Sequence, residues 1–218
     1  MNNMNTWVAR FAIAYLSLNS VAVAQWTEKN NGLFGGTVSC LATSGSKLFA
    51  GTPSNGVFLS TNNGTSWTAV NNGLGLLFIR SLVIDGSSIY AGTAGGGVFK
   101  SVNDGATWTA MNGGLNSTIR NISALTVSGS NIFAGIVGTA GGVFLSTDNG
   151  ANWTSISNGL TNHNIGSIVV NGDNLYATTF GGGVFLSTNN GSSWTAINTG
   201  LSTLHVFSLT VSGPNLLA

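Results

Sequence analysis

The chain has 218 residues, of which only 5% are charged and 43% are hydrophobic, with 32 glycines and a formal net charge of +1. Charged residues usually make up about a quarter of a soluble protein, and no run of Lys or Arg is present here. The composition therefore excludes the basic surface that nucleic acids or acidic membranes bind, and its apolar content excludes a disordered chain. The many Gly, Ser, Thr and Asn residues favour short strands and tight turns over helices.

The first 24 residues predict a secretory signal peptide. Arg10 precedes an apolar run over residues 11–24, which ends in an Ala-Val-Ala cleavage pattern. A membrane anchor is the alternative, but the run is shorter than the ~20 residues that a span requires and contains Asn19. We therefore expect cleavage before Gln25, a secreted or periplasmic location, no integral membrane segment after cleavage, and one mature domain over residues 25–218.

Tryptophan marks a repeat along the mature chain. A Trp followed by Thr recurs at intervals of 41, 41, 45 and 41 residues, at Trp26, Trp67, Trp108, Trp153 and Trp194. Each interval holds four short runs rich in β-branched and aromatic residues, which in the second unit cover residues 79–84, 88–92, 98–101 and 108–111. Four short strands every ~42 residues predict an all-β fold, built from the blades of a β-propeller.

The sequence contains four complete units of the repeat and a partial fifth. An alanine expected in the second strand of each unit stands at Ala50, Ala91, Ala134 and Ala177, and its fifth occurrence is the last residue, Ala218. We expect an incomplete ring from a truncated product. The alternative is a five-bladed ring in which the Trp26 strand serves as the outer strand of the last blade. Without closure, exposed sheet edges at the two ends favour self-association.

The most regular part of each unit is the motif S-x-[N/D]-x-G-x-x-W. Its glycine can adopt positive φ in a sharp turn, its Ser and Asn or Asp oxygens can accept hydrogen bonds from loop N–H groups, and its Trp can pack against the blade. We interpret the motif as structural, because Asn replaces Asp in three copies and a calcium ligand or catalytic carboxylate would not survive that change. The copies are Ser60, Asn62, Gly64 and Trp67 in the first, Ser101, Asn103, Gly105 and Trp108 in the second, Ser146, Asp148, Gly150 and Trp153 in the third, and Ser187, Asn189, Gly191 and Trp194 in the fourth.

This motif resembles the Asp-box, or BNR repeat, of sialidases, xyloglucanases, sortilin-type receptors and photosystem II assembly-factor-like proteins. The resemblance extends over residues 26–218 and implies that the motif forms the hairpin between the third and fourth strands of a blade. At the namesake position only Asp148 is acidic. Because these families differ in activity, the resemblance implies a propeller and no particular reaction.

Few residues of the mature chain could carry catalysis or bind a metal. All five acidic residues fall in expected turns or directly after a Trp-Thr pair: Glu28, Asp85, Asp104, Asp148 and Asp173. With two arginines, the mature chain lacks the arginine triad that a resemblance to sialidases implies. The single Cys40 is interpreted as a small buried hydrophobic residue rather than a nucleophile. We therefore expect no catalytic residue, no metal and no cofactor.

The loops that differ between units predict a ligand surface. In a propeller, the first-to-second-strand turns and the motif hairpins emerge on one face, and both are alike in every unit. The fourth-to-first and second-to-third connections share the opposite face, and they vary. Mixed aromatic and polar residues at matched positions suit recognition, although drift in unconstrained loops is the alternative. The candidate ligand residues are Phe78, Arg80, Arg120, Asn121, His163, Asn164, His205 and Phe207.

Together these features predict a binding or scaffolding module for an unknown protein or glycan partner. A fragment of a carbohydrate-active enzyme of the xyloglucanase or sialidase kind is the first alternative. A truncated product with no function of its own is the second.

Overall fold

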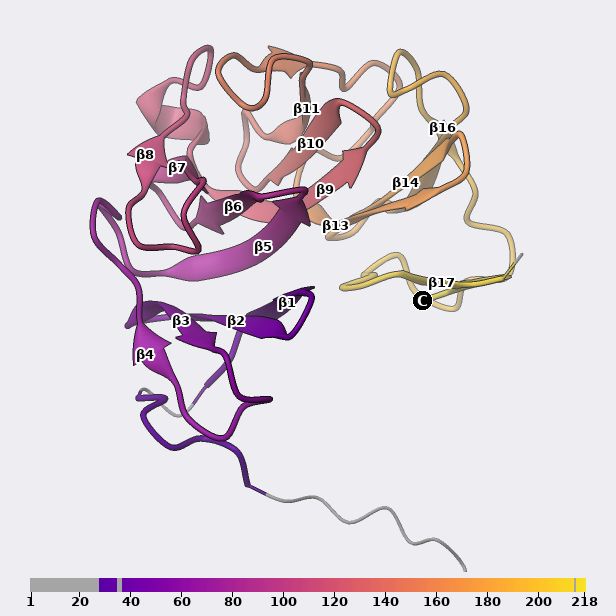
Figure 1. Cartoon of the computed structure of the whole chain (residues 1–218). Helices are drawn as coiled ribbons and strands as arrows, with labels where there is room; N and C mark the ends of the chain where they lie inside the picture. The colour runs from indigo at the N-terminus through magenta and orange to yellow at the C-terminus, as the bar shows by residue number, and fades with distance from the viewer. Residues whose placement is uncertain (1–27, 35–36, 214) are drawn as a thin grey trace, which may run out of the picture.

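The computed structural model describes residues 28–34, 37–213 and 215–218, so the predicted signal peptide and Trp26 lie outside the described residues. The described chain forms four four-stranded antiparallel sheets and one two-stranded sheet (Figure 1). In each four-stranded sheet the strands lie in sequence order, so each unit of the repeat folds into its own sheet. The all-β prediction is confirmed.

The strands follow the repeat closely. Unit 1 contains β1 (Cys40–Ser44), β2 (Lys47–Thr52), β3 (Gly56–Ser60) and β4 (Thr68–Ala69). Unit 2 contains β5 (Ile79–Asp85), β6 (Ser88–Thr93), β7 (Gly97–Ser101) and β8 (Thr109–Ala110). Unit 3 contains η1 (Ser117–Ile119), a 3-10 turn, then β9 (Ile122–Ser128), β10 (Asn131–Ile136), β11 (Gly142–Ser146) and β12 (Thr154–Ser155). Unit 4 contains β13 (Ile165–Asn171), β14 (Asn174–Thr179), β15 (Gly183–Ser187) and β16 (Thr195–Ala196), and unit 5 contains β17 (Thr210–Ser212) and β18 (Asn215–Leu217).

The sheets stand around a common centre with their first strands innermost. β1 contacts β5, β5 contacts β9 and β9 contacts β13, while the outer strands lie at the periphery (Figure 1). The hydrophobic core is therefore divided into layers between neighbouring sheets. One layer joins Phe49 of unit 1 to Ile79, Phe99 and Trp108 of unit 2, and a stacked array of this kind is stabilised mainly by such nearest-neighbour interfaces.

The ring is open, as expected for four units and a partial fifth. Unit 5 contacts β13 through β17, and no sheet of the described residues combines strands of the first and last units. The outer strand that Trp26 would supply to close a five-bladed ring lies outside the described residues. Within the described ranges, no helix is long and apolar enough to span a bilayer.

The fourth strand of each unit is shorter than the sequence indicates. Residues 108–111 were expected to form it in unit 2, but only Thr109–Ala110 pair with β7 as a strand. Beyond these two residues, the Met111 N–H still donates to the Val98 carbonyl of β7 (2.8 Å), whereas the Trp108 N–H donates to the carbonyl of Asn72, which precedes unit 2 (2.8 Å). Because hydrogen-bonded and non-hydrogen-bonded pairs alternate along an antiparallel ladder, the N–H of Trp108 faces away from β7 and is free to contact the preceding segment.

Cys40 lies at the inner edge of unit 1, half-buried against the layer that contains Phe49 and Ile79. Burial raises the pKa of its thiol to about 12, so the side chain stays protonated and uncharged at neutral pH. This environment suits a packing residue, because reactive cysteines need an accessible thiolate.

Candidate functional site

The two faces of the array carry different kinds of loop. Lys47, the first residue of β2 after the β1–β2 turn, forms an ion pair with Asp104 of the unit 2 motif hairpin (Nζ to Oδ2 2.6 Å). These two turn classes therefore share one face, which we name the motif face. On the opposite side, the second-to-third-strand turns bridge to the fourth-to-first-strand loops, as in Ala94 with Asn121 and Phe180 with His205. We name this side the loop face.

The glycine of each motif hairpin adopts the left-handed backbone that the sequence predicted. All four glycines are buried and have φ between 78° and 88°, a conformation that a residue with a Cβ rarely adopts. The backbone N–H of each donates to the hydroxyl of its motif serine at 2.9 Å. These glycines are Gly64, Gly105, Gly150 and Gly191, and their serine partners are Ser60, Ser101, Ser146 and Ser187.

The Asn or Asp of each hairpin closes the same turn. Its Oδ1 accepts the serine hydroxyl at 2.8–3.0 Å and the backbone N–H four residues further along the chain at 2.9 Å. The four residues are Asn62, Asn103, Asp148 and Asn189. Because this oxygen is occupied in every copy, whether it belongs to a carboxamide or a carboxylate, the geometry agrees with a structural motif.

Asp148 offers a test of that structural role. The backbone N–H of Asn152, then its side-chain Nδ2 and the Ser146 hydroxyl, lower the pKa of Asp148 from 3.8 to about 2. Because the folded-state pKa is depressed, the ionised carboxylate stabilises the fold above about pH 4, and this contribution is lost as pH falls toward about 2. We expect Asp148→Asn to remove this pH dependence, so that thermal unfolding curves of the variant and the wild type converge between pH 5 and pH 2.

A second variant serves as the control for Asp148→Asn. Where the motif carries Asn, its amide donates to a hydroxyl, as Asn62 does to Ser66 (2.9 Å), whereas Asp148 accepts from the Asn152 amide (2.8 Å). The double change Asp148→Asn with Asn152→Ser recreates the neutral pairing, and it should recover stability at pH 7 without recovering the acid dependence. A constant stability difference across this pH range would contradict the carboxylate's assigned role.

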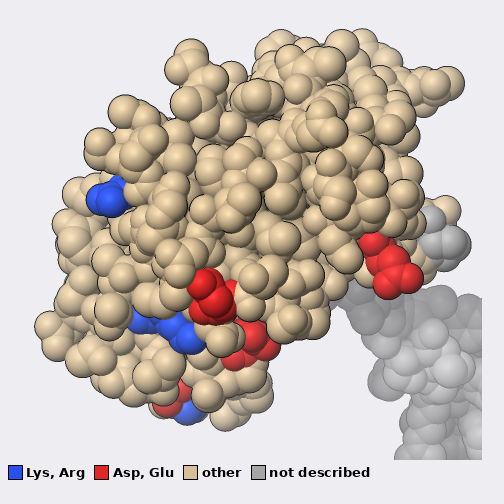
Figure 2. Space-filling view, turned by 90° about the horizontal axis from the view of Figure 1, so that it is seen from above, with Lys and Arg blue, Asp and Glu red and all other residues tan. Residues whose placement is uncertain are grey.

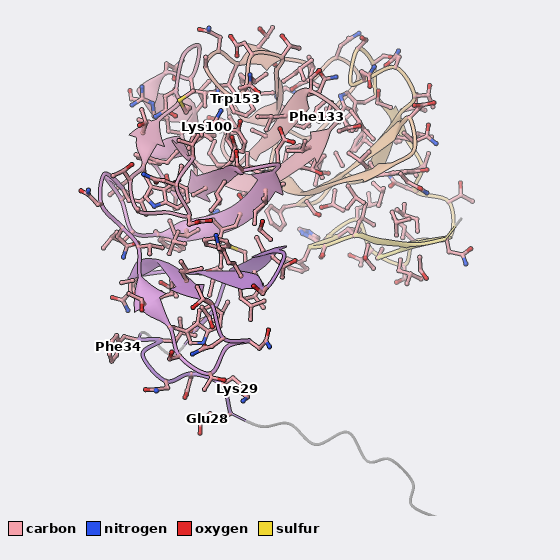
Figure 3. All side chains as sticks on the ribbon, in the orientation of Figure 1. Glu28, Lys29, Phe34, Lys100, Phe133 and Trp153 are labelled. Carbon is pink, nitrogen blue, oxygen red and sulfur yellow. The ribbon has the colours of Figure 1, made fainter. Side chains whose placement is uncertain are left out.

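The motif Trp fastens each unit to the one before it. The indole N–H of Trp67, Trp108, Trp153 and Trp194 donates to a main-chain carbonyl of the preceding unit or segment at 2.7–2.9 Å. Trp153, labelled in Figure 3, is only 4% exposed and binds the Met111 carbonyl in this way. The indole thus has the partner that its burial requires, and this partner comes from outside its own hairpin.

On the loop face, the innermost strand of each complete unit after the first begins with a β-bulge. The register of the innermost strand shifts between Ile79 and Ser81, which leaves Arg80 unpaired with β6. Ser123 and Gly166 occupy the matching positions of β9 and β13. Because bulges re-aim side chains and recur beside functional sites, these positions are suited to display different residues without changing the sheet.

The clearest surface feature of the loop face is an apolar run between units 1 and 2. Leu76, Leu77 and Phe78 are 45%, 39% and 42% exposed, and the Arg80 guanidinium lies 5.3 Å from the centre of the Phe78 ring. Phe34, 71% exposed, lies beside the same turn, because Asn55 donates to the Phe34 carbonyl and Gly56 to that of Leu77. We call Phe34 and residues 76–78 the apolar patch.

Sequence reasoning selected Phe78 and Arg80 but missed the rest of this patch. Leu76 and Leu77 stand directly before Phe78, and three consecutive large apolar residues in a loop were the available signal. Phe34 stands in a Leu-Phe pair ahead of two glycines, and this context does not distinguish it from a packing residue.

Other predicted ligand residues are partly occupied in holding the loops together. The Arg120 carbonyl accepts from both Gly95 and Gly97, and the Asn164 side chain accepts from the Gly138 N–H (2.9 Å). Arg120 and Asn164 are therefore bound into the loop scaffold.

Asn121 and His163 differ in their surroundings. The main chain of Asn121 is held in the loop as well, because its carbonyl accepts from the Val137 N–H (3.0 Å). Asn121 pairs with Ala94, and its side-chain oxygen is buried without a hydrogen bond from any described residue. His163 is exposed in the loop before β13. Asn121 thus offers an acceptor that the described loops do not use.

A second aromatic group lies at the unit 4 and unit 5 end of the loop face. The rings of Phe180 and Phe207 meet edge to face with centres 5.5 Å apart, and Phe207 is 73% exposed. His205 and Phe207 line a shallow pocket together with Leu201 and Val206. The structure thus places the eight predicted residues in separate groups around the ring rather than in one cluster.

The surface offers little charge for catalysis or ion binding. Figure 2 shows a few Lys, Arg, Asp and Glu side chains on an otherwise uncharged face. Within the part of the chain that the structure describes, no group of three His, Cys, Asp or Glu side chains is arranged to hold a metal ion.

Solved structures with the same architecture are numerous, although no protein-family model and no curated protein match the sequence. An ancestral GH74 enzyme is 24% identical, with a TM-score of 0.65 over 80% of this chain and 25% of that one. The chain has the fold of a β-propeller. The extracellular domain of the putative one component system BT4673 from B. thetaiotaomicron is 20% identical, with a TM-score of 0.64 over 83% of this chain and 24% of that one.

A third propeller neighbour is described as YCF48 bound to D1 peptide. It is 16% identical, with a TM-score of 0.57 over 79% of this chain and 55% of that one. The present chain therefore spans about a quarter of the length of the first two neighbours and about half of the third. At these identities the likeness establishes the fold, while activities differ among proteins that share it.

Proposed function

We propose that this chain is a secreted or periplasmic binding module, with Asp-box-type hairpins as its scaffold and the loop face as its ligand surface. The observation that carries the proposal is the apolar patch, where Phe34 and residues 76–78 stay exposed although the strands of unit 2 bury most of their large side chains. Exposed, contiguous apolar residues typically mark interaction surfaces. The predicted signal peptide supports the location.

The chemistry of the patch favours a protein partner over a glycan. Leu76 and Leu77 offer aliphatic surface without hydrogen-bonding groups, and Phe78 with Arg80 supplies the aromatic and guanidinium pair that is enriched at protein interfaces. The YCF48 neighbour, described as bound to a peptide, is a propeller of comparable architecture. A peptide or protein segment is therefore the ligand class that we assign.

Peptide and glycan arrays probed with the full chain test this assignment. Any peptide that binds should lose at least about tenfold in affinity when Phe78, Arg80, His205 and Phe207 are changed to Ala, because buried aromatic and Arg anchors dominate binding energy. The control carries Lys47→Ala and Val102→Ser on the motif face, where Val102 is 65% exposed. Binding that survives the loop-face changes, or that disappears in the control, would place the ligand elsewhere. A glycan hit would reverse the choice of ligand class.

A part of a GH74-like carbohydrate-active enzyme is the second candidate, favoured by the ancestral GH74 neighbour. Glycoside hydrolysis generally needs two carboxyl groups about 5–10 Å apart across a cleft. Among the described residues, Asp85 ends β5 next to the β5–β6 turn, and Asp173 lies in the β13–β14 turn. Asp104 and Asp148 lie in motif hairpins, so all four are on the motif face.

The remaining acidic residue, Glu28, also lies toward the motif face. It precedes Lys29, whose Cβ is next to the motif glycine Gly64. The loop-face turns of the described chain thus carry no Asp or Glu side chain, and this distribution favours the binding module over a hydrolase site.

A further inference from the structure

A hollow of about 410 Å³ lies on the motif face between units 1 and 2, where β5 packs against β1 and β2 (Figure 1). Its floor consists of Ile84 and Ile89, which belong to the apolar layer between these two units. Cavities of about 300–1,000 Å³ commonly hold small molecules, so this one is large enough for such a ligand. Its rim is formed by Ser44 and Lys47 of unit 1 and by Ser87, Val102 and Asp104 of unit 2.

Three residues of this rim depart from the repeat. The motif hairpins of units 1, 3 and 4 carry Thr where unit 2 carries Val102, and they carry Asn where unit 2 carries Asp104. The second strand begins with Ser or Asn in units 2 to 4, but with Lys47 in unit 1. All three departures line one hollow. The joint between units 1 and 2 therefore carries charged and apolar side chains at positions where the next two joints carry neutral polar ones.

Folding does not require these three residues. Asp104 has φ of 56°, and the Asn at its position in the other hairpins has φ of 54–58°, so the turn is the same with either residue. Val102 is 65% exposed and therefore buries little apolar surface. The side chains of Lys47 and Asp104 are 39% and 50% exposed, and exposed ion pairs contribute little to stability. A contact with a molecule outside the chain explains all three departures together.

The two charges of the hollow select against a ligand that carries only one charge. The Lys47 ammonium lies 2.6 Å from Oδ2 of Asp104, and this bond uses one of its three N–H groups and one of the two carboxylate oxygens. A small anion attracted to Lys47 would be repelled by Asp104, and a small cation would meet the opposite conflict. A zwitterion avoids both conflicts, because it replaces one exposed ion pair with two.

The uncharged part of the hollow combines aliphatic side chains with hydroxyl groups. Ile84, Ile89 and Val102 offer branched aliphatic carbon, whose contact with apolar ligand atoms is favourable and makes no directional demand. The hydroxyls of Ser44 and Ser87 can donate to a carboxylate or accept from an ammonium group. The hollow thus suits a small molecule with two opposite charges and an aliphatic chain.

We propose that this hollow is a binding site for a free aliphatic amino acid. The ligand carboxylate pairs with Lys47, its ammonium group pairs with Asp104, and its side chain contacts Ile89 and Val102. Lys47 and Asp104 separate to admit the ligand, which costs little because both side chains are exposed. The site lies on the motif face, so it is separate from the ligand surface on the loop face, and neither proposal depends on the other.

Isothermal titration calorimetry of the full chain with L-leucine, and separately with L-valine, tests the proposal. We expect saturable binding of at least one of them with a dissociation constant below about 1 mM. The N-acetyl derivative lacks the ammonium group and the amide derivative lacks the carboxylate, so each should bind at least about fivefold more weakly. No saturation by either amino acid at about 10 mM, or tighter binding of glucose or acetate, would overturn the proposal.

Asp104→Asn assigns the ligand's orientation, and it introduces the residue that the other three hairpins carry at this turn. It should weaken binding of the amino acid at least about fivefold and leave binding of its N-acetyl derivative unchanged, because only the free amino acid carries the ammonium group. Asp173→Asn is the matched control, since it removes a carboxylate from the same face in the β13–β14 turn. An equal loss for both ligands with Asp104→Asn, or an equal loss in the control, would contradict the proposed site.

Discussion

Gly114→Ala is expected to destabilise the array by about 3–5 kcal/mol, which corresponds to a fall in Tm of roughly 10 °C. Gly114 has φ of 79°, and its Cβ would lie 2.3 Å from the carbonyl oxygen of Trp153. Left-handed backbone costs a non-glycine residue about 1–2 kcal/mol. The clash with main chain accounts for the rest, since neither backbone can move freely.

Gly200→Ala separates the cost of the left-handed backbone from the cost of the clash with the Trp carbonyl. Gly200 shares the backbone conformation of Gly114, but its surroundings are open. It should therefore cost only the strain of about 1–2 kcal/mol, or a few degrees in Tm. Thermal unfolding followed by far-UV circular dichroism compares the two variants directly. Equal shifts would show that the close approach of Gly114 to Trp153 contributes nothing to stability.

Trp153→Ala should have the second large effect. Its side chain is 4% exposed in the middle of the array, and its loss removes both the hydrogen bond to Met111 and a buried aromatic ring. Truncating a buried Trp typically costs about 3–5 kcal/mol. Because the ring lies between units 2 and 3, the variant should unfold in more than one step, with the units on either side uncoupled.

Trp67 supplies the matched control, because it makes the same hydrogen bond to the Lys29 carbonyl at 2.8 Å but is only half-buried. Trp67→Ala should cost about 1–2 kcal/mol and leave a single transition. Denaturant unfolding followed by circular dichroism, whose backbone signal does not depend on the missing indole, distinguishes the variants. If both variants unfolded in a single transition with equal shifts of the midpoint, the Trp153 ring would not couple units 2 and 3 as we expect.

Much of the fold could be predicted because each unit repeats the same local pattern of strands and turns. The Trp spacing, the turn glycines and the β-branched runs placed β5 and β6 within one residue of their observed ends. The outer strand was predicted too long, since only Thr109–Ala110 pair with β7 as a strand, and the sequence did not indicate that the Trp108 N–H binds the Asn72 carbonyl. Every residue type carries a main-chain carbonyl, so the sequence does not indicate which carbonyl accepts a given N–H. Contacts between units therefore could not be predicted from the sequence alone.

The motif hairpins were the most predictable part of the molecule, because their hydrogen bonds are local. The serine, the Asn or Asp and the glycine lie within five residues, so the turn that joins Ser101, Asn103 and Gly105 can be inferred from their spacing. The copy with Ser187, Asn189 and Gly191 forms the same bonds. The indole partner lies 38 to 42 residues away, and the spacing alone does not identify it.

The candidate ligand residues were less predictable. Comparing units identified Arg80 as variable, and the structure shows it to be a bulge residue on the innermost strand. The same comparison selected Asn164, whose side chain holds the Gly138 N–H. Variation between units reports only that a position is unlike its counterparts, and both a ligand contact and a loop-specific hydrogen bond produce that pattern.

Because the indole N–H of each motif Trp binds a main-chain carbonyl, the residue that supplies this carbonyl can be Lys29, Val70, Met111 or Ile156 without loss of the bond. Different units thus attach to their neighbours through the same main-chain contacts. Gene segments one period long could be duplicated, deleted or exchanged with little need for compensating substitutions, and the number of units is free to change faster than the shape of each one.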